Sequence, residues 1–136
     1  IRCMLYHEVS HALLTPNVNS KISHTILNIF EDERIETLLD SYYMDVDFKD
    51  FVKRMNDFNP NIPPANELEY FYRVVRFRFG DESLVSRVNR IIYDARFITG
   101  KEICGENNYS FDDYQDDVLE LYEDCKKYFE SHYERK

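Results

Sequence analysis

The stretch ISHTILNIFEDERIETLL, residues 22–39, determines the fold class expected for this 136-residue chain. Its apolar residues recur at spacings of three and four, at Ile22, Ile26, Ile29 and Phe30. This is the period of an α-helix with one face turned towards a core. Ser20 or Ser23 can cap its first turn, and we expect the helix to continue to about Leu39.

Other segments of the chain have the same helical period and are separated by proline or glycine. A helix should end before Thr15-Pro16, because the residue before a proline is pushed out of helical geometry. The expected helices are residues 4–14, 20–39, 47–58, 67–79 and 82–98, and a last one from Ser110 onward. Residues 74–80, VVRFRFG, alternate apolar and basic residues as a short strand would, but a helix fits their surroundings better, and we find no convincing strand. We therefore expect a mostly helical, all-α bundle that forms one domain over residues 1–136.

Composition and charge exclude several classes of protein. The formal net charge is -9, so phosphate backbones are repelled and nucleic acid is not an expected partner. No apolar run approaches the roughly 18 residues of a membrane span. The three cysteines are far apart, which favours free thiols in a reducing, cytoplasmic compartment. The chain begins with Ile, and we interpret it as part of a longer polypeptide.

Residues 7–11, HEVSH, carry the pattern of a metal-binding helix. His7 and His11 are four apart, so on a helix both imidazoles project from one face and can bind one metal ion. Glu8 would lie beside that ion without being a ligand, where it can accept a proton from an activated water. The same five-residue pattern also arises by chance, and a catalytic zinc needs a third protein ligand.

An acidic cluster lies twenty residues beyond His11, on the expected helix of residues 20–39. If that helix begins at Ser20, Glu31 lies roughly 16 Å along its axis. For Glu31 to meet both histidines, the turn before the helix must span this distance. An extended turn of five to eight residues, at about 3.3 Å each, can do so. Glu31 is therefore the first candidate for the third ligand.

The two motifs together resemble those of the gluzincin metallopeptidases, in which a Glu on a following helix completes the His-Glu-x-x-His site. More narrowly, HEVSHALLTP and HTILNIFEDERIETLL resemble the zincin-like segment of bacterial and phage proteins that often carry a von Willebrand A domain, including relatives of the cobaltochelatase T-type subunit. The pattern Asn-x-x-Glu-Asp-x-Arg-x-Glu is matched by Asn28, Glu31, Asp32, Arg34 and Glu36. The resemblance covers about residues 4–42.

This resemblance implies a zinc-dependent peptidase with a peptide or protein substrate. It places Zn²⁺ on His7, His11 and Glu31, with Glu8 as the general base. Asn28, Asp32 and Glu36 become supporting residues or alternative ligands. The resemblance also implies a partner outside this region, either a von Willebrand A domain or an ATPase.

The sequence departs from the family pattern in two ways. Thermolysin-like enzymes place an Asp four residues after the ligand Glu, where this chain has Ile35. Asp32 with Glu36, or Glu36 with Asp40, would supply that spacing, so the identity of the third ligand stays open. No sheet for holding a substrate precedes the motif. The alternative function is therefore a non-catalytic metal-binding or interaction module of a chelatase or ATPase assembly.

Several other residues have simpler expected roles. Arg34 should pair with Glu31, Asp32 or a neighbouring acid. His24 should cap a helix or face solvent, and Cys104 and Cys125 should be packing or surface thiols. The segment VVRFRFG, residues 74–80, is expected to be helical, with solvated arginines at Arg73, Arg76 and Arg78.

Overall fold

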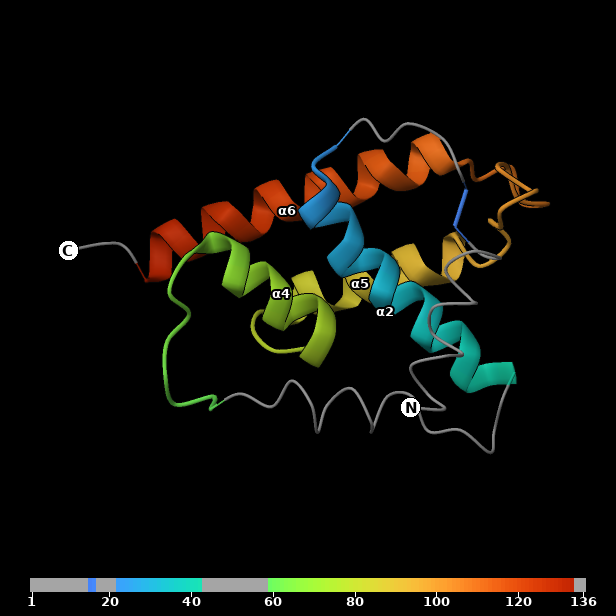
Figure 1. Ribbon diagram of the computed structural model, residues 1–136. Coiled ribbons are helices and arrows are strands. Elements are labelled where there is room, and N and C mark those ends of the chain that lie inside the picture. Colours follow the sequence, from blue (N-terminus) through green and yellow to red (C-terminus); the bar gives the residue numbers. More distant parts are fainter. Residues whose placement is uncertain (1–14, 17–21, 43–58, 134–136) are drawn as a thin grey trace.

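The computed structural model describes residues 15–16, 22–42 and 59–133, and it is mostly helical (Figure 1). The helices in these ranges are α2 (His24–Tyr42), α4 (Glu67–Phe77), α5 (Glu82–Asp94) and α6 (Phe111–His132). No strand occurs within the described ranges, where Cys104 and Ser110 form an isolated bridge. The all-α bundle expected from the sequence is confirmed. The helices expected at residues 4–14 and 47–58 lie outside the described residues.

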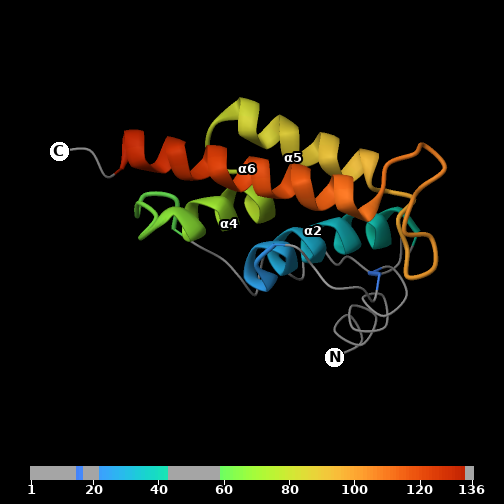
Figure 2. The same ribbon diagram turned by 90° about the horizontal axis from the view of Figure 1, so that it is seen from above.

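The longest helix, α6, lies between α5 on one side and the pair α2 and α4 on the other (Figure 2). Its buried side chains recur every three or four residues and meet those of all three neighbours. The core joins residues of all four helices, among them Leu27, Phe30, Phe71, Val74, Val88, Ile92, Val118 and Leu121. Aromatic pairs connect the helices, with Phe30 edge-on to Tyr114 at 5.7 Å between ring centroids.

Three of the helices begin at side-chain caps. Asn66 accepts a hydrogen bond from the Glu69 amide at the start of α4, and Asp81 accepts one from the Ser83 amide at the start of α5. At α6, Ser110 and Asp113 form a reciprocal capping box. The start of α6 at Ser110 was predicted from the sequence.

Two helices end earlier than the sequence indicated, and each has a local cause. Helix α4 ends at Phe77 because Arg78 adopts a left-handed conformation, with φ of 52°. Gly80 then reverses the chain at φ of 110°, where a Cβ atom would lie 2.6 Å from the hydroxyl oxygen of Tyr70. Helix α5 ends at Asp94 rather than Ile98, and its terminal turn is stabilised by a side chain of α2 that is described below.

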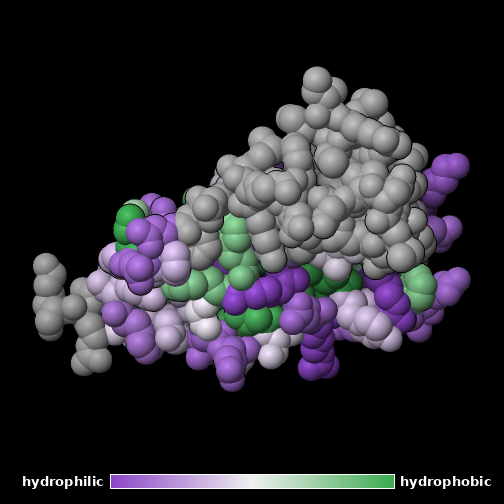
Figure 3. All heavy atoms as spheres, turned by 90° about the horizontal axis from the view of Figure 1, so that it is seen from below, coloured by the Kyte–Doolittle hydropathy of each residue, from purple (hydrophilic) through white to green (hydrophobic). Residues whose placement is uncertain are grey.

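The surface of the described region is largely hydrophilic. On the face shown in Figure 3, hydrophobic residues are interspersed with hydrophilic ones. Of the helices that the structure describes, none combines the length and the apolar character that crossing a membrane requires.

The two described thiols differ in environment, and this predicts a difference in reactivity. Cys125 is fully buried on α6, and burial raises the pKa of its thiol to about 12, so only about one in ten thousand is ionised near pH 8. Cys104 is exposed on the connector to α6. In a Cys3→Ser background, iodoacetamide should modify Cys104 at least about 100-fold faster than Cys125, as followed by mass spectrometry. Comparable rates in the folded protein would contradict the buried position of Cys125.

Candidate functional site

The site begins with Glu31, which lies in the middle of α2 and is 1% exposed. Arg34, three residues on, donates from Nε to Glu31 Oε1 at 2.6 Å and from Nη2 to Oε2 at 3.2 Å. The Thr15 hydroxyl donates to the same Oε2 at 2.6 Å. Both carboxylate oxygens of Glu31 are therefore held in place.

Glu31 is ionised although it is buried. Burial alone would raise the pKa of its carboxyl, but the charge and hydrogen bonds of Arg34, together with Thr15, outweigh this and hold the pKa below its usual value. Burial would likewise lower the pKa of Arg34, and the Glu31 charge reverses this. An ionised carboxylate is the form that binds a metal ion.

Arg34 also connects α2 to the end of α5. Its Nη1 donates to the carbonyl oxygens of Ala95 and Ile98, both at 3.0 Å, and so satisfies two acceptors just beyond the last turn of α5. The predicted pairing of Arg34 with an acid of its own helix is confirmed for Glu31. A single fully buried guanidinium thus fixes both the carboxylate and the position of α2 against the α5–α6 connector.

Tyr114 of α6 completes this cluster, and no motif in the sequence pointed to it. The Arg34 guanidinium lies over its ring, 5.4 Å from the centroid. Burial and the nearby Glu31 charge raise the pKa of the Tyr114 hydroxyl well above its ordinary value. Tyr114 is 83 residues from Glu31, so only its place in the apolar period of α6, with Val118 and Leu121, could have marked it as buried.

A second charged cluster lies where α2 meets α4. Arg76 Nη2 donates to both carboxylate oxygens of Glu36 at 3.1 Å, and its Nη1 lies 3.4 Å from Glu33 Oε1. Arg78 Nη1 donates to Glu33 Oε2 at 2.8 Å. Both glutamates are buried, at 1% for Glu33 and 2% for Glu36. These groups tie the two helices together by charge as well as by apolar packing.

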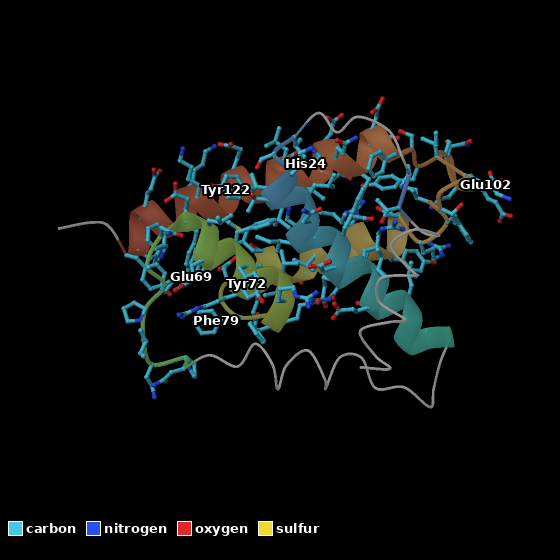
Figure 4. All side chains as sticks on the ribbon, viewed as in Figure 1. His24, Glu69, Tyr72, Phe79, Glu102 and Tyr122 are labelled. Atoms are coloured by element: carbon cyan, nitrogen blue, oxygen red, sulfur yellow. The ribbon has the colours of Figure 1, made fainter. Side chains whose placement is uncertain are left out.

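The expectation of solvated arginines on α4 is therefore wrong. Arg76 is only 7% exposed, because the α4 face that carries it packs against the acids of α2. Arg73 is 5% exposed and donates to the carbonyl oxygen of Ile62 at 2.7 Å and to Glu69 at 3.0 Å. Its guanidinium lies over Phe79, which Figure 4 shows on the same side of α4 as Glu69. Arg78, with 27% of its side chain exposed, is only partly buried.

The remaining predicted residues are distributed around α2. Asn28 is exposed, Asp32 is half-buried, and the Glu36 carboxylate is held by Arg76. His24 is exposed at the start of the helix, as expected (Figure 4). Within the described ranges, no three His, Cys, Asp or Glu side chains gather as a metal site would require. The two histidines of the motif, His7 and His11, and the candidate base Glu8 lie outside the described residues.

Comparison of the chain with protein-family models, with curated proteins and with solved structures gave no match.

Proposed function

We propose that this chain is the zinc-binding region of a gluzincin-like metallopeptidase, with His7, His11 and Glu31 as the protein ligands. When bound, zinc would lower the pKa of a coordinated water and polarise the carbonyl of the scissile peptide. Glu8 would take the proton from the attacking water and pass it to the leaving amine. The substrate is then a peptide or a protein.

The observation that carries this proposal is the hydrogen bond from Thr15 to Glu31. Thr15 follows His11 by only four residues, so the covalent chain limits the separation of their Cα atoms to about 14 Å. The carboxylate of Glu31 is thus bonded to the chain shortly after the motif. This supports Glu31 over the other acids of α2 as the ligand that joins His7 and His11.

The chemistry of the Glu31 carboxylate supports the same assignment. It is ionised, and the three hydrogen bonds from Arg34 and Thr15 use three of its about four acceptor positions. A metal ion would bind at the remaining position, which the Tyr114 hydroxyl also approaches. Arg34 would then be the residue that orients the ligand, a role whose loss weakens metal affinity about 10- to 100-fold in known sites. Glu36 is held instead by Arg76 of α4, and it is Glu31 that accepts the hydrogen bond from Thr15.

Zinc content tests the proposal directly. We expect about one equivalent of zinc per purified chain, because three protein ligands and one water complete its usual coordination. His11→Ala should lose most of this zinc, whereas His24→Ala, which alters an exposed histidine of α2, should keep it. Zinc would be measured by atomic emission after dialysis. Equal zinc in the wild type and in His11→Ala would refute the ligand set.

One observation favours a second function. Glu31, Glu33 and Glu36 all take part in buried ion pairs, so the buried acids of α2 can hold the fold together without metal chemistry. The chain would then be a non-catalytic module that docks onto a von Willebrand A domain or an ATPase. A zinc site closed by four protein ligands would favour this function, and a coordination position open to water would favour the peptidase.

A further inference from the structure

A second site is formed between α2 and α5, away from Glu31. A hollow of about 260 Å³ is lined by apolar atoms of Leu38 and Ile92, with Tyr93, Arg78 and Arg96 also along its walls. This is slightly smaller than the about 300–1,000 Å³ of typical small-molecule sites. A hollow of this size suits one amino-acid residue of a ligand rather than a large cofactor.

Arg96 is a cation held in one position. Its guanidinium carbon lies 3.8 Å from the centroid of the Tyr93 ring and 4.4 Å from that of Phe97, and its Nη1 donates to the Tyr93 carbonyl oxygen at 2.6 Å. Among the described residues, no carboxylate forms an ion pair with it. Contacts with two rings and a carbonyl oxygen restrict the side chain before any ligand arrives, so less rotamer freedom is lost on binding.

Arg78 supplies a second guanidinium to the same hollow. Its Nε donates to Asn89 Oδ1 at 2.9 Å, and its Nη1 donates to Glu33 at 2.8 Å. Asn89 and Tyr93 are four residues apart on α5, so the contacts that anchor Arg78 and Arg96 are separated by about 6 Å along the helix axis. The hollow therefore has two cations at its edge and an apolar interior.

From this arrangement we infer that the hollow binds the C-terminal residue of a partner polypeptide that ends in an apolar side chain. The terminal carboxylate pairs with Arg96 and Arg78, because guanidinium groups match the planar geometry of a carboxylate. The apolar side chain packs on Leu38 and Ile92. The net charge of -9 disfavours polyanions such as nucleic acid, whereas a single carboxylate is accepted. This site is independent of the proposed peptidase function.

Binding of N-acetyl-leucine and of N-acetyl-leucinamide tests the inference, because the two differ only in the terminal charge. Titration calorimetry on chelator-treated protein keeps any bound metal from contributing. We expect the carboxylate to bind about tenfold more tightly than the amide. Arg96→Gln should remove this preference. The variant should fold, because Arg96 contacts Tyr93 and Phe97, which are close to it in the sequence.

Arg90→Gln is the matched control. It removes the same charge six residues earlier, on α5, but Arg90 is 83% exposed in its side chain and lies beside Asp94, outside the hollow. The Arg90→Gln variant should prefer N-acetyl-leucine over the amide as strongly as the wild type does. Three results would each overturn the inference. They are equal binding of N-acetyl-leucine and its amide by the wild type, an equal loss of the carboxylate preference in Arg96→Gln and Arg90→Gln, and displacement of N-acetyl-leucine by an equal concentration of inorganic phosphate.

Discussion

Arg34→Met is expected to lower the free energy of unfolding by about 3–5 kcal/mol, the usual loss when one partner of a buried ion pair is removed. The variant leaves the Glu31 carboxylate buried without its guanidinium. It also strips the hydrogen bonds from the carbonyl oxygens of Ala95 and Ile98. Urea denaturation followed by far-ultraviolet circular dichroism measures the change.

Two further variants decide whether the ion pair is the cause. Arg90→Met removes an exposed arginine and should change stability by less than about 0.5 kcal/mol. Glu31→Gln combined with Arg34→Met leaves no unpaired charge, so the double variant should be more stable than Arg34→Met alone. If Arg34→Met costs under about 1 kcal/mol, Arg34 does not have the buried role described here.

The pair of Glu31 and Arg34 should also make the free energy of unfolding depend on pH in the acidic range. Because the pKa of Glu31 is lower in the folded chain than its ordinary 4.5, its contribution is fully present above about pH 4.5. That contribution is lost as the pH falls through the lower folded pKa. The difference in stability between the wild type and the double variant should therefore shrink over this acidic range.

Glu8→Gln is expected to lower kcat/KM for peptide hydrolysis by about 10²- to 10⁴-fold while zinc content stays unchanged. Glutamine matches the shape of glutamate but cannot accept the proton of the attacking water. Cleavage of a quenched fluorescent peptide library measures activity, and atomic emission measures zinc.

Glu102→Gln provides the control for this experiment, since Glu102 is exposed on the connector between α5 and α6 (Figure 4). That variant should retain full activity. Undiminished hydrolysis by Glu8→Gln would remove Glu8 from the mechanism, and a parallel loss of zinc would indicate a structural role for it instead.

Helices α4, α5 and α6 could be predicted from the sequence because their apolar residues follow a regular period. Helix α2 follows it less clearly, because several of its buried residues are charged. Their ends were less predictable, since they depend on single residues and on distant partners. Arg78 ends α4 by adopting a left-handed conformation that few arginines adopt. The end of α5 is held by Arg34, more than sixty residues earlier in the chain.

Of the contacts around Glu31, the pairing with Arg34 was predicted. Glu31 and Arg34 are three residues apart on one helix, so their pairing follows from local spacing. The contact with Tyr114 depends on how α6 packs against α2, which no local pattern specifies. The burial of Arg73 and Arg76 was missed because a charged residue on a helix is normally solvated, unless another helix supplies an acid or a carbonyl oxygen.

The ion pairs between α2 and α4 also specify how the two helices align. An apolar contact can slide by one helical turn and still exclude water, at a modest loss of packing. Arg76 must reach Glu33 and Glu36 together, while Arg78 reaches Glu33 from the end of the same helix. A shift of one turn, about 5.4 Å, would leave unneutralised charges inside the protein. The ion pairs therefore favour a single register of α2 against α4. This register fixes the position of α2 along the neighbouring helix.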